Sequence, residues 1–157
     1  MHGAAGALGT FAVQLARAWG AGAVIGTASE ANHDHLRSIG AIPVTYGDGL
    51  VDRVRAIGRV DAALDLVGGD ALRASAALVE DRDRIRTMVD DDTAAELGVP
   101  ALTPGRSAAR LLELNELYER GLITVHIRHA YPFTSAADAH RDLETGHGRG
   151  KVVLIVP

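Results

Sequence analysis

The chain opens with Met1-His-Gly-Ala-Ala-Gly-Ala-Leu-Gly-Thr-Phe-Ala-Val-Gln-Leu-Ala-Arg-Ala-Trp19, a glycine-rich turn followed by apolar residues at helical spacing. Glycines let the backbone approach a pyrophosphate, whose charge the N–H groups and dipole of a following helix stabilise. Alanine replaces the first glycine in Ala4-x-Gly6-x-x-Gly9, so the pattern alone is weak. A plain tight turn in an Ala/Gly-rich segment is the alternative. The helix and strand expected next favour phosphate binding.

Short apolar runs alternate with helical spacing along the rest of the chain. Strands are expected at 23–27, 42–46, 60–67, 85–89, 124–129 and 151–156, with an edge strand at 99–102. Helices are expected at 10–19, around 36–39, and at 50–57, 71–79, 93–97, 107–120 and 135–145, with Ser107 as a cap and Ser135–Asp138 as a capping box.

This alternation predicts an α/β fold of the Rossmann type, a doubly wound and mostly parallel sheet with helices on both faces. Only Met1 and His2 precede the turn, so the first strand of such a sheet is nearly missing. We expect one domain over 1–157, truncated at its start. Within it, 124–157 forms a C-terminal return segment with a helix and the last strand.

Composition excludes several classes of function. The 157 residues suffice for one domain with a core, and their net charge of −4 comes from interspersed acids and bases. Without a basic stripe, a nucleic-acid partner is not expected. The absence of cysteine excludes disulfides and thiolate metal sites and fits a cytoplasmic protein. No run of 18 apolar residues and no signal-like start occurs, so neither a membrane span nor secretion is expected.

The strand expected at 23–27 ends in Gly26-Thr-Ala-Ser-Glu30, which bears on the choice of cofactor. Ala28 stands where NAD-binding folds usually carry an acid for the ribose hydroxyls. A small neutral residue leaves room for a 2′-phosphate, so NADP(H) is favoured over NAD(H), although Glu30 keeps the question open. Candidate donors to that phosphate are Ser29, Asn32, His33 and Arg37. The alternative is that Ser29 and Asn32 only cap the next helix.

Histidine pairs and one aspartate pair are the remaining candidate site residues. The pairs His33-x-His35 and His126-x-x-His129 lack a cysteine or clear carboxylate partner, so surface histidines are favoured over metal ligands. Asp61 and Asp65 share one face of the strand expected at 60–67, and two buried carboxylates there would be unusual. Asp65 is therefore a candidate site residue, with a tie to a neighbouring loop as the alternative.

Several motifs, in order, resemble the medium-chain dehydrogenases/reductases, specifically the zinc-free quinone oxidoreductase branch. They are His2–Ala16, Val24–Ser29, Leu36–Ala41, Val60–Gly69, Ala136–His140, Glu144–Gly146 and Gly150–Leu154. The resemblance covers essentially the whole chain. It implies a nicotinamide cofactor without a metal, and hydride transfer from NAD(P)H to a small hydrophobic quinone, enone or other carbonyl compound.

The resemblance also implies roles for residues of this chain. Ala4, Gly6, Ala7, Leu8 and Gly9 would hold the pyrophosphate; Ser29, Asn32 and His33 would lie near the adenosine ribose or its phosphate; Tyr46 would lie near the adenine; and Val67 and Gly68 would lie near the nicotinamide. Members of the family often dimerise through a sheet edge, so a homodimer through 99–102 is expected.

Members of this family also carry an N-terminal catalytic domain that is absent from this sequence, as is most of the first strand. An empty central slot would leave buried backbone groups unpaired, each costing about 1–3 kcal/mol. We expect Lys151–Val156 to fill that slot, within the chain or swapped into a second copy.

Two alternatives to a cofactor-dependent reductase follow from the missing domain. One is a repurposed protein without cofactor that isomerises, eliminates or cyclises a hydrophobic small molecule. Its acid or base would come from Asp65, Tyr46, His2, His126 or His129. The other is a non-catalytic module that assembles with another subunit.

Overall fold

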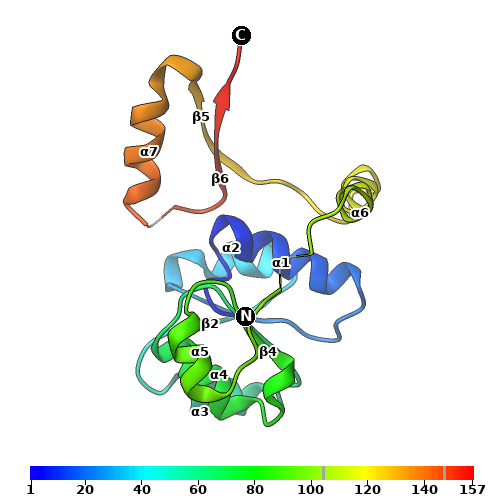
Figure 1. Ribbon diagram of the computed structural model, residues 1–157, viewed down its shortest axis with the longest axis vertical. Helices are drawn as coiled ribbons and strands as arrows, with labels where there is room; N and C mark the ends of the chain where they lie inside the picture. The colour runs from blue at the N-terminus through cyan, green and yellow to red at the C-terminus, as the bar shows by residue number, and fades with distance from the viewer. Residues whose placement is uncertain (104, 147) are drawn as a thin grey trace.

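The computed structural model describes residues 1–103, 105–146 and 148–157. In chain order its elements are α1 (Ala7–Ala18), β1 (Ile25–Ala28), η1 (Glu30–Asn32), α2 (His33–Ser38), β2 (Ile42–Thr45), α3 (Leu50–Ile57), β3 (Ala63–Asp65), α4 (Asp70–Leu78), η2 (Arg82–Arg84), β4 (Ile85–Thr87), α5 (Asp91–Leu97), α6 (Ala108–Glu119), β5 (Ile127–Pro132), η3 (Phe133–Ser135), α7 (Ala136–Glu144) and β6 (Lys151–Ile155). Strands and helices alternate as expected, and the α/β class is confirmed (Figure 1).

All strand pairs are parallel: β1 with β2, β3 with β4, and β5 with β6. The first four residues connect the first two pairs. The Ala4 amide donates to the Thr27 carbonyl (3.1 Å), the Thr27 amide to the Met1 carbonyl (2.9 Å), and the His2 amide to the Leu64 carbonyl (3.0 Å). The order across this layer is therefore β2, β1, residues 1–4, β3, β4.

The central slot is thus occupied by residues 1–4 rather than by the C-terminal strand. The expectation that Lys151–Val156 fills it within the chain is wrong, because β6 pairs with β5 from Ile127 to Pro132 instead. Residues 1–4 form hydrogen bonds to both neighbours, β1 and β3. A dimer with swapped strands stays a prediction.

β1 is covered by helices on both faces, as a doubly wound sheet requires. Val24 packs in one apolar cluster with Val13 of α1 and Leu36 of α2. The next residue, Ile25, packs against a second cluster that contains Val54 of α3. Successive side chains of a strand point to opposite faces, so these two clusters lie on the two sides of the sheet. A third cluster joins α4, β4 and α5.

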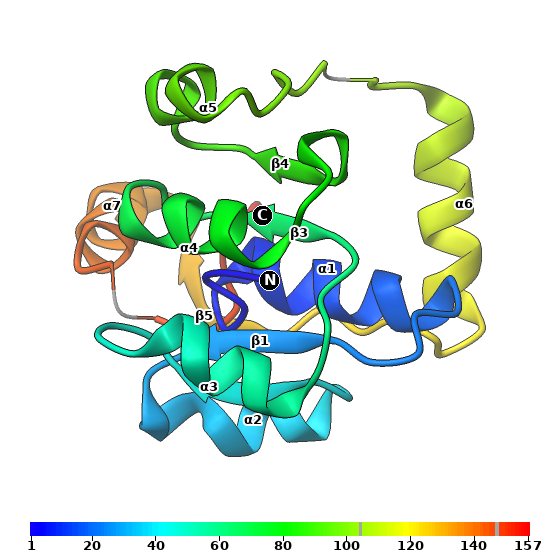
Figure 2. The ribbon, with the colours of Figure 1, turned by 90° about the horizontal axis from the view of Figure 1, so that it is seen from below.

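The C-terminal part of the chain, residues 124–157, lies apart from this layer. β5, α7 and β6 gather at one end of the molecule, and α6 stands to the side (Figures 1 and 2). Gln14 of α1 ties this part to the layer: its Oε1 accepts from the Thr124 amide (2.9 Å) and hydroxyl (3.0 Å), and its Nε2 donates to the Thr124 carbonyl (3.1 Å). An isolated bridge between Gly6 and Gly150 adds a second link.

Several element boundaries differ from the expected ones. Residues 99–102 form no strand, because no neighbouring strand in the described part pairs with them, so the expected edge strand is wrong. The strand expected at 60–67 is confined to β3, and the one at 124–129 is shifted to β5. Ser107 caps α6 as predicted, accepting from the Arg110 amide (3.2 Å). Ser135 forms no cap, because η3 precedes α7 there. Within the described residues no helix combines the length and apolar character that a membrane crossing needs.

Candidate functional site

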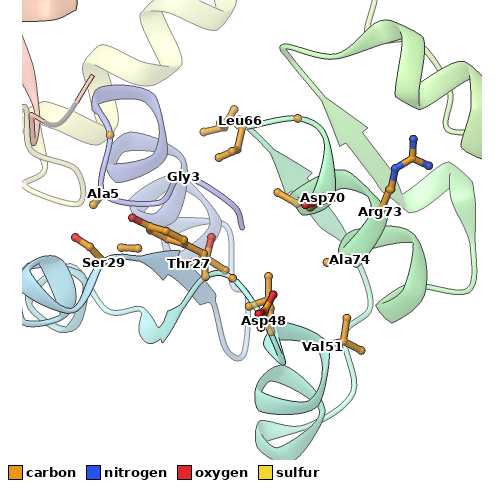
Figure 3. A pocket seen from close by; sticks show the side chains of 18 of the residues that line it. Gly3, Ala5, Thr27, Ser29, Asp48, Val51, Leu66, Asp70, Arg73 and Ala74 are labelled. Carbon is orange, nitrogen blue, oxygen red and sulfur yellow. The ribbon is translucent and has the colours of Figure 1, made fainter. Parts of the chain in front are cut away.

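A cavity of about 1120 Å³ opens at the carboxyl ends of β1, β2 and β3. Doubly wound sheets bind ligands at this edge, where the direction of winding reverses. Here the reversal falls at residues 1–4, between β1 and β3. Ser29 and Asp70 lie on opposite walls, with Thr27 and Leu66 between them (Figure 3).

The opening turn forms one wall of the cavity through Gly3, Ala5 and Gly6. Gly3 has φ +66°, a conformation that glycine adopts at no steric cost. Gly6 is the residue before α1, which has no side-chain cap and no acidic residue in its first turn. The positive end of the α1 dipole is therefore not offset locally and can stabilise an anion in the cavity.

Six of the eleven residues expected to contact the cofactor line this cavity. They are Gly6, Ser29, Asn32, Tyr46, Val67 and Gly68. The other five, which the cavity lining does not include, are Ala4, Ala7, Leu8, Gly9 and His33. Ala4 and Gly9 are buried in the packing between the turn and α1. No residue other than glycine has positive φ in the described part of the chain, so alanine fits at position 4.

Ser29 and Asn32 face the cavity instead of capping a helix. Neither forms a side-chain cap, so the capping alternative is wrong. The side-chain amide of Asn32 donates to the hydroxyl of Ser29 (3.1 Å), so the two side chains form one polar pair. Arg37 is engaged at the surface with Asp34 (2.7 Å). The Nε2 atom of His33 lies 3.5 Å from the Thr45 hydroxyl.

Asp65 is fully buried at the end of β3 and holds the following loop. Its Oδ1 accepts from the amides of Val67 (3.0 Å) and Gly68 (3.1 Å), and its Oδ2 accepts from the Thr87 hydroxyl (2.7 Å). These bonds fix the turn that brings Val67 and Gly68 to the cavity wall. The geometry therefore matches the loop-tie alternative for Asp65.

The candidate acid–base residues are not brought together. His2 is buried beside Thr27, and burial, with a smaller contribution from the Met1 amino group, lowers the pKa of His2 to about 4. The rings of His126 and His35 are 5.5 Å apart. His129 stacks on Tyr131 at 4.1 Å. Of the five candidates Asp65, Tyr46, His2, His126 and His129, Tyr46 alone belongs to the cavity lining.

Burial, followed by the charge of His126, lowers the pKa of His35. Among the described residues no group of three or more histidines, aspartates or glutamates is placed to hold a metal ion.

Sequence reasoning missed several lining residues. Asp48 and Asp52 come from the loop and helix after β2, and Asp70 and Arg73 from α4. Arg73 forms an ion pair with Glu96 (2.8 Å) across the surface. The run Gly47-Asp48-Gly49 was the one sequence feature that indicated these residues. It follows an expected strand, and loops that follow parallel strands lie at the carboxyl edge of the sheet.

The sequence of this chain matches a known protein family. Residues 39–154 match the model of the zinc-binding dehydrogenase family. The polyketide synthase system protein NorB of Streptomyces orinoci is 31% identical over 175 residues, covering 100% of this chain and 8% of NorB.

Solved structures show the same likeness. The quinone oxidoreductase from Coxiella burnetii is 31% identical with a TM-score of 0.84, covering 99% of this chain and 51% of that one. Mycobacterial Rv1454c complexed with NADPH is 27% identical with a TM-score of 0.79, covering 99% and 55%. The chain thus spans about half the length of these two proteins and a small part of NorB. The chain belongs to the zinc-binding dehydrogenase family and is a quinone-oxidoreductase-like medium-chain dehydrogenase/reductase.

Proposed function

We propose that this chain binds NADP(H) in the cavity and forms the nucleotide-binding half of an oxidoreductase. Its hydride would pass to a quinone, an enone or another carbonyl compound. The observation that carries the proposal is the position of the cavity of about 1120 Å³, at the carboxyl edge of β1–β3 and against the uncapped start of α1. That edge is the dinucleotide site of doubly wound folds, and the volume is large enough for a cofactor.

The lining suggests how the cofactor lies. The pyrophosphate rests against Gly3 and Gly6, where the dipole of α1 stabilises its charge. The adenosine half extends toward Ser29 and Tyr46, and the nicotinamide toward Val67. The NADPH bound to mycobacterial Rv1454c supports this choice of ligand.

Preference for NADP(H) follows from the end of β1. Ala28 brings no carboxylate to the ribose, whereas Ser29 and Asn32 offer a hydroxyl and an amide at the cavity wall. An acid at this position would accept the 2′-hydroxyl of NAD(H) and repel a 2′-phosphate. Ser29 and Asn32 are neutral, so they favour the 2′-phosphate by hydrogen bonding and by not repelling its charge.

Efficient turnover needs a further protein surface that covers the nicotinamide. Hydride transfer requires that the cofactor and the substrate are held close together and that water is excluded from them. Exposed apolar side chains on the C-terminal part support contact with another domain or subunit: Phe133 is 57% exposed, Leu143 52% and Ile155 59%. We propose that residues 1–157 by themselves bind the cofactor but oxidise it slowly, and that another domain or subunit, such as a second copy in a cytoplasmic homodimer, completes the site.

A proton-transfer reaction without cofactor needs an acid or base within reach of the substrate. Asp65 and His2 are buried in hydrogen-bonded positions, but Tyr46 lines the cavity, as do Asp48, Asp52 and Asp70. The position of the cavity at the uncapped start of α1, and not a lack of acids or bases, is therefore what favours cofactor binding.

Titration with NADPH and NADH tests the proposal. Trp19 is 62% exposed just after the end of α1, away from the turn, so the fluorescence of the reduced nicotinamide is the better readout. We expect saturable NADPH binding and roughly tenfold weaker NADH binding. Absence of NADPH binding would overturn the proposal, and equal binding of both nucleotides would overturn the preference.

A further inference from the structure

The loop between β2 and α3, residues 46–49, forms part of the cavity wall, and one side chain donates to several of its carbonyls. Gly47 and Gly49 adopt φ +90° and +74°. Tyr46, Gly47, Asp48 and Gly49 all line the cavity. Two glycines in four residues give this loop much conformational freedom to lose on folding, so something outside the loop must restrict it.

Arg53, the fourth residue of α3, supplies that restriction together with the backbone bond from the Leu50 amide to the Gly47 carbonyl (3.1 Å). The Nη1 of Arg53 donates to the Asp48 carbonyl (2.6 Å). The two hydrogens of its Nη2 are shared among the carbonyls of Thr45 (2.9 Å), Gly47 (3.3 Å) and Tyr46 (3.4 Å). Its Nε also donates to the Thr45 carbonyl (3.3 Å). One guanidinium therefore binds four consecutive carbonyls. Bonds from a charged donor are stronger than neutral ones, and the planar fork loses little entropy in forming several.

Arg53 does not belong to the residues that line the cavity, so it acts on the site through the loop. Its bonds end on backbone atoms on both sides of Tyr46, whose side chain is 60% exposed. Packing around that side chain therefore constrains it little. The hydrogen bonds to the backbone fix the position of the Tyr46 backbone and so the point from which its side chain leaves the loop.

We infer that Arg53 is the positioning residue for the adenosine half of the site, holding Tyr46 and the 46–49 loop in the conformation that receives the adenine. The inference rests on the proposed function. A loop ordered before binding pays no ordering cost when the ligand arrives, so loss of Arg53 weakens binding without removing any contact to the ligand.

The test compares Arg53→Met with Arg17→Met. Arg17 also donates to two loop carbonyls, Ala21 (2.9 Å) and Gly22 (3.0 Å), but before β1 and away from the cavity. The ligands are NADPH and 2′,5′-ADP, which carries the adenosine half alone. We expect Arg53→Met to raise both dissociation constants by the same factor, about five- to tenfold, and Arg17→Met to change neither. Arg53→Lys keeps the charge without the fork and restores part of the affinity.

A double-mutant cycle separates positioning from general stability. In a Tyr46→Ala background, Arg53→Met should weaken 2′,5′-ADP binding by less than about twofold, because the side chain it positions is gone. Additive effects would overturn the inference. So would a loss of NADPH affinity without loss of 2′,5′-ADP affinity, or equal losses in Arg17→Met. If the wild-type chain binds neither ligand, the proposed function falls and the inference with it. If the wild type binds and Arg53→Met is unchanged, the inference alone falls.

Discussion

Gly9 faces the backbone of the opening turn so closely that a side chain at position 9 would collide with the carbonyl oxygen of Gly3. A Cβ there would also lie 2.6 Å from the Ala4 Cα. At Gly6 the nearest atom to such a Cβ is the Gly3 carbonyl oxygen, at an ordinary 3.4 Å. The two glycines of one motif therefore serve different purposes: Gly9 allows α1 to pack, and Gly6 leaves the cavity open.

Substitution by alanine should separate these roles. We expect Gly9→Ala to lower the free energy of unfolding by about 2–3 kcal/mol, because the atoms it strikes are backbone atoms that cannot rotate away. Gly6→Ala should leave stability within about 0.5 kcal/mol and raise the NADPH dissociation constant severalfold. Urea denaturation and nucleotide titration measure the two effects. Equal losses of stability would contradict this assignment.

Asp65 should be needed for stability. In Asp65→Ala the amides of Val67 and Gly68 and the hydroxyl of Thr87 lose their acceptor in a buried site. We expect the free energy of unfolding to fall by about 3 kcal/mol. Asp61→Asn is the control, because Asp61 is exposed and paired with Arg59 at the surface, and it should unfold like the wild type. An Asp65→Ala chain of unchanged stability would refute the loop-tie role.

His2 should make the fold sensitive to acid. Its pKa in the folded chain is about 4, below the ordinary 6.5, because burial disfavours the charged ring. The unfolded chain therefore takes up the proton first. The contribution of neutral His2 to the free energy of unfolding is fully present above pH 6.5. It is lost as the pH falls toward 4, at about 1.4 kcal/mol per pH unit.

In His2→Gln this part of the pH dependence should disappear, whereas in His140→Gln, which changes an exposed histidine of α7, it should persist. Urea denaturation at several pH values between 4 and 7 measures it. Parallel pH profiles for wild type and His2→Gln would exclude the His2 contribution.

Ser29→Asp should change the choice of nucleotide. A carboxylate at the cavity wall would repel the 2′-phosphate of NADPH and accept the 2′-hydroxyl of NADH. We expect NADPH to bind at least roughly tenfold more weakly, with NADH unchanged or tighter. Ser38→Asp, which adds the same charge at the exposed end of α2, is the matched control. Equal weakening of both nucleotides would place the 2′-phosphate elsewhere.

Gln14 should hold the C-terminal part against α1. Gln14→Ala removes both the acceptor and the donor that Thr124 uses, while Asn115→Ala removes an exposed amide of α6. Hydrogen exchange in β5 and β6 should become faster in Gln14→Ala and stay unchanged in Asn115→Ala, because the freed segment opens locally. Unchanged exchange in Gln14→Ala would mean that the Gly6–Gly150 bridge suffices.

Local sequence patterns predicted where helices and strands lie better than they predicted which strands pair with one another. The helices at 50–57 and 93–97 could be placed because periodicity and nearby glycines are properties of neighbouring residues. Pairing is not local: the strand predicted at 99–102 lacks a neighbour in the described part, and β6 pairs with β5 rather than entering the centre. In the site, Ser29 could be found from the end of an expected strand, and Tyr46 from the family resemblance. Arg73 could not, because its place on the wall depends on how α4 packs.

The sequence by itself determined the alternation of strands and helices, the uncapped turn before α1 and the neutral end of β1, because each depends on residues adjacent in the chain. Only the tertiary structure decided that residues 1–4 lie between β1 and β3, that Asp65 holds a loop, and that Arg53 donates to four consecutive carbonyls. These arrangements depend on backbone groups, which are alike in every sequence, so their partners are specified by the fold.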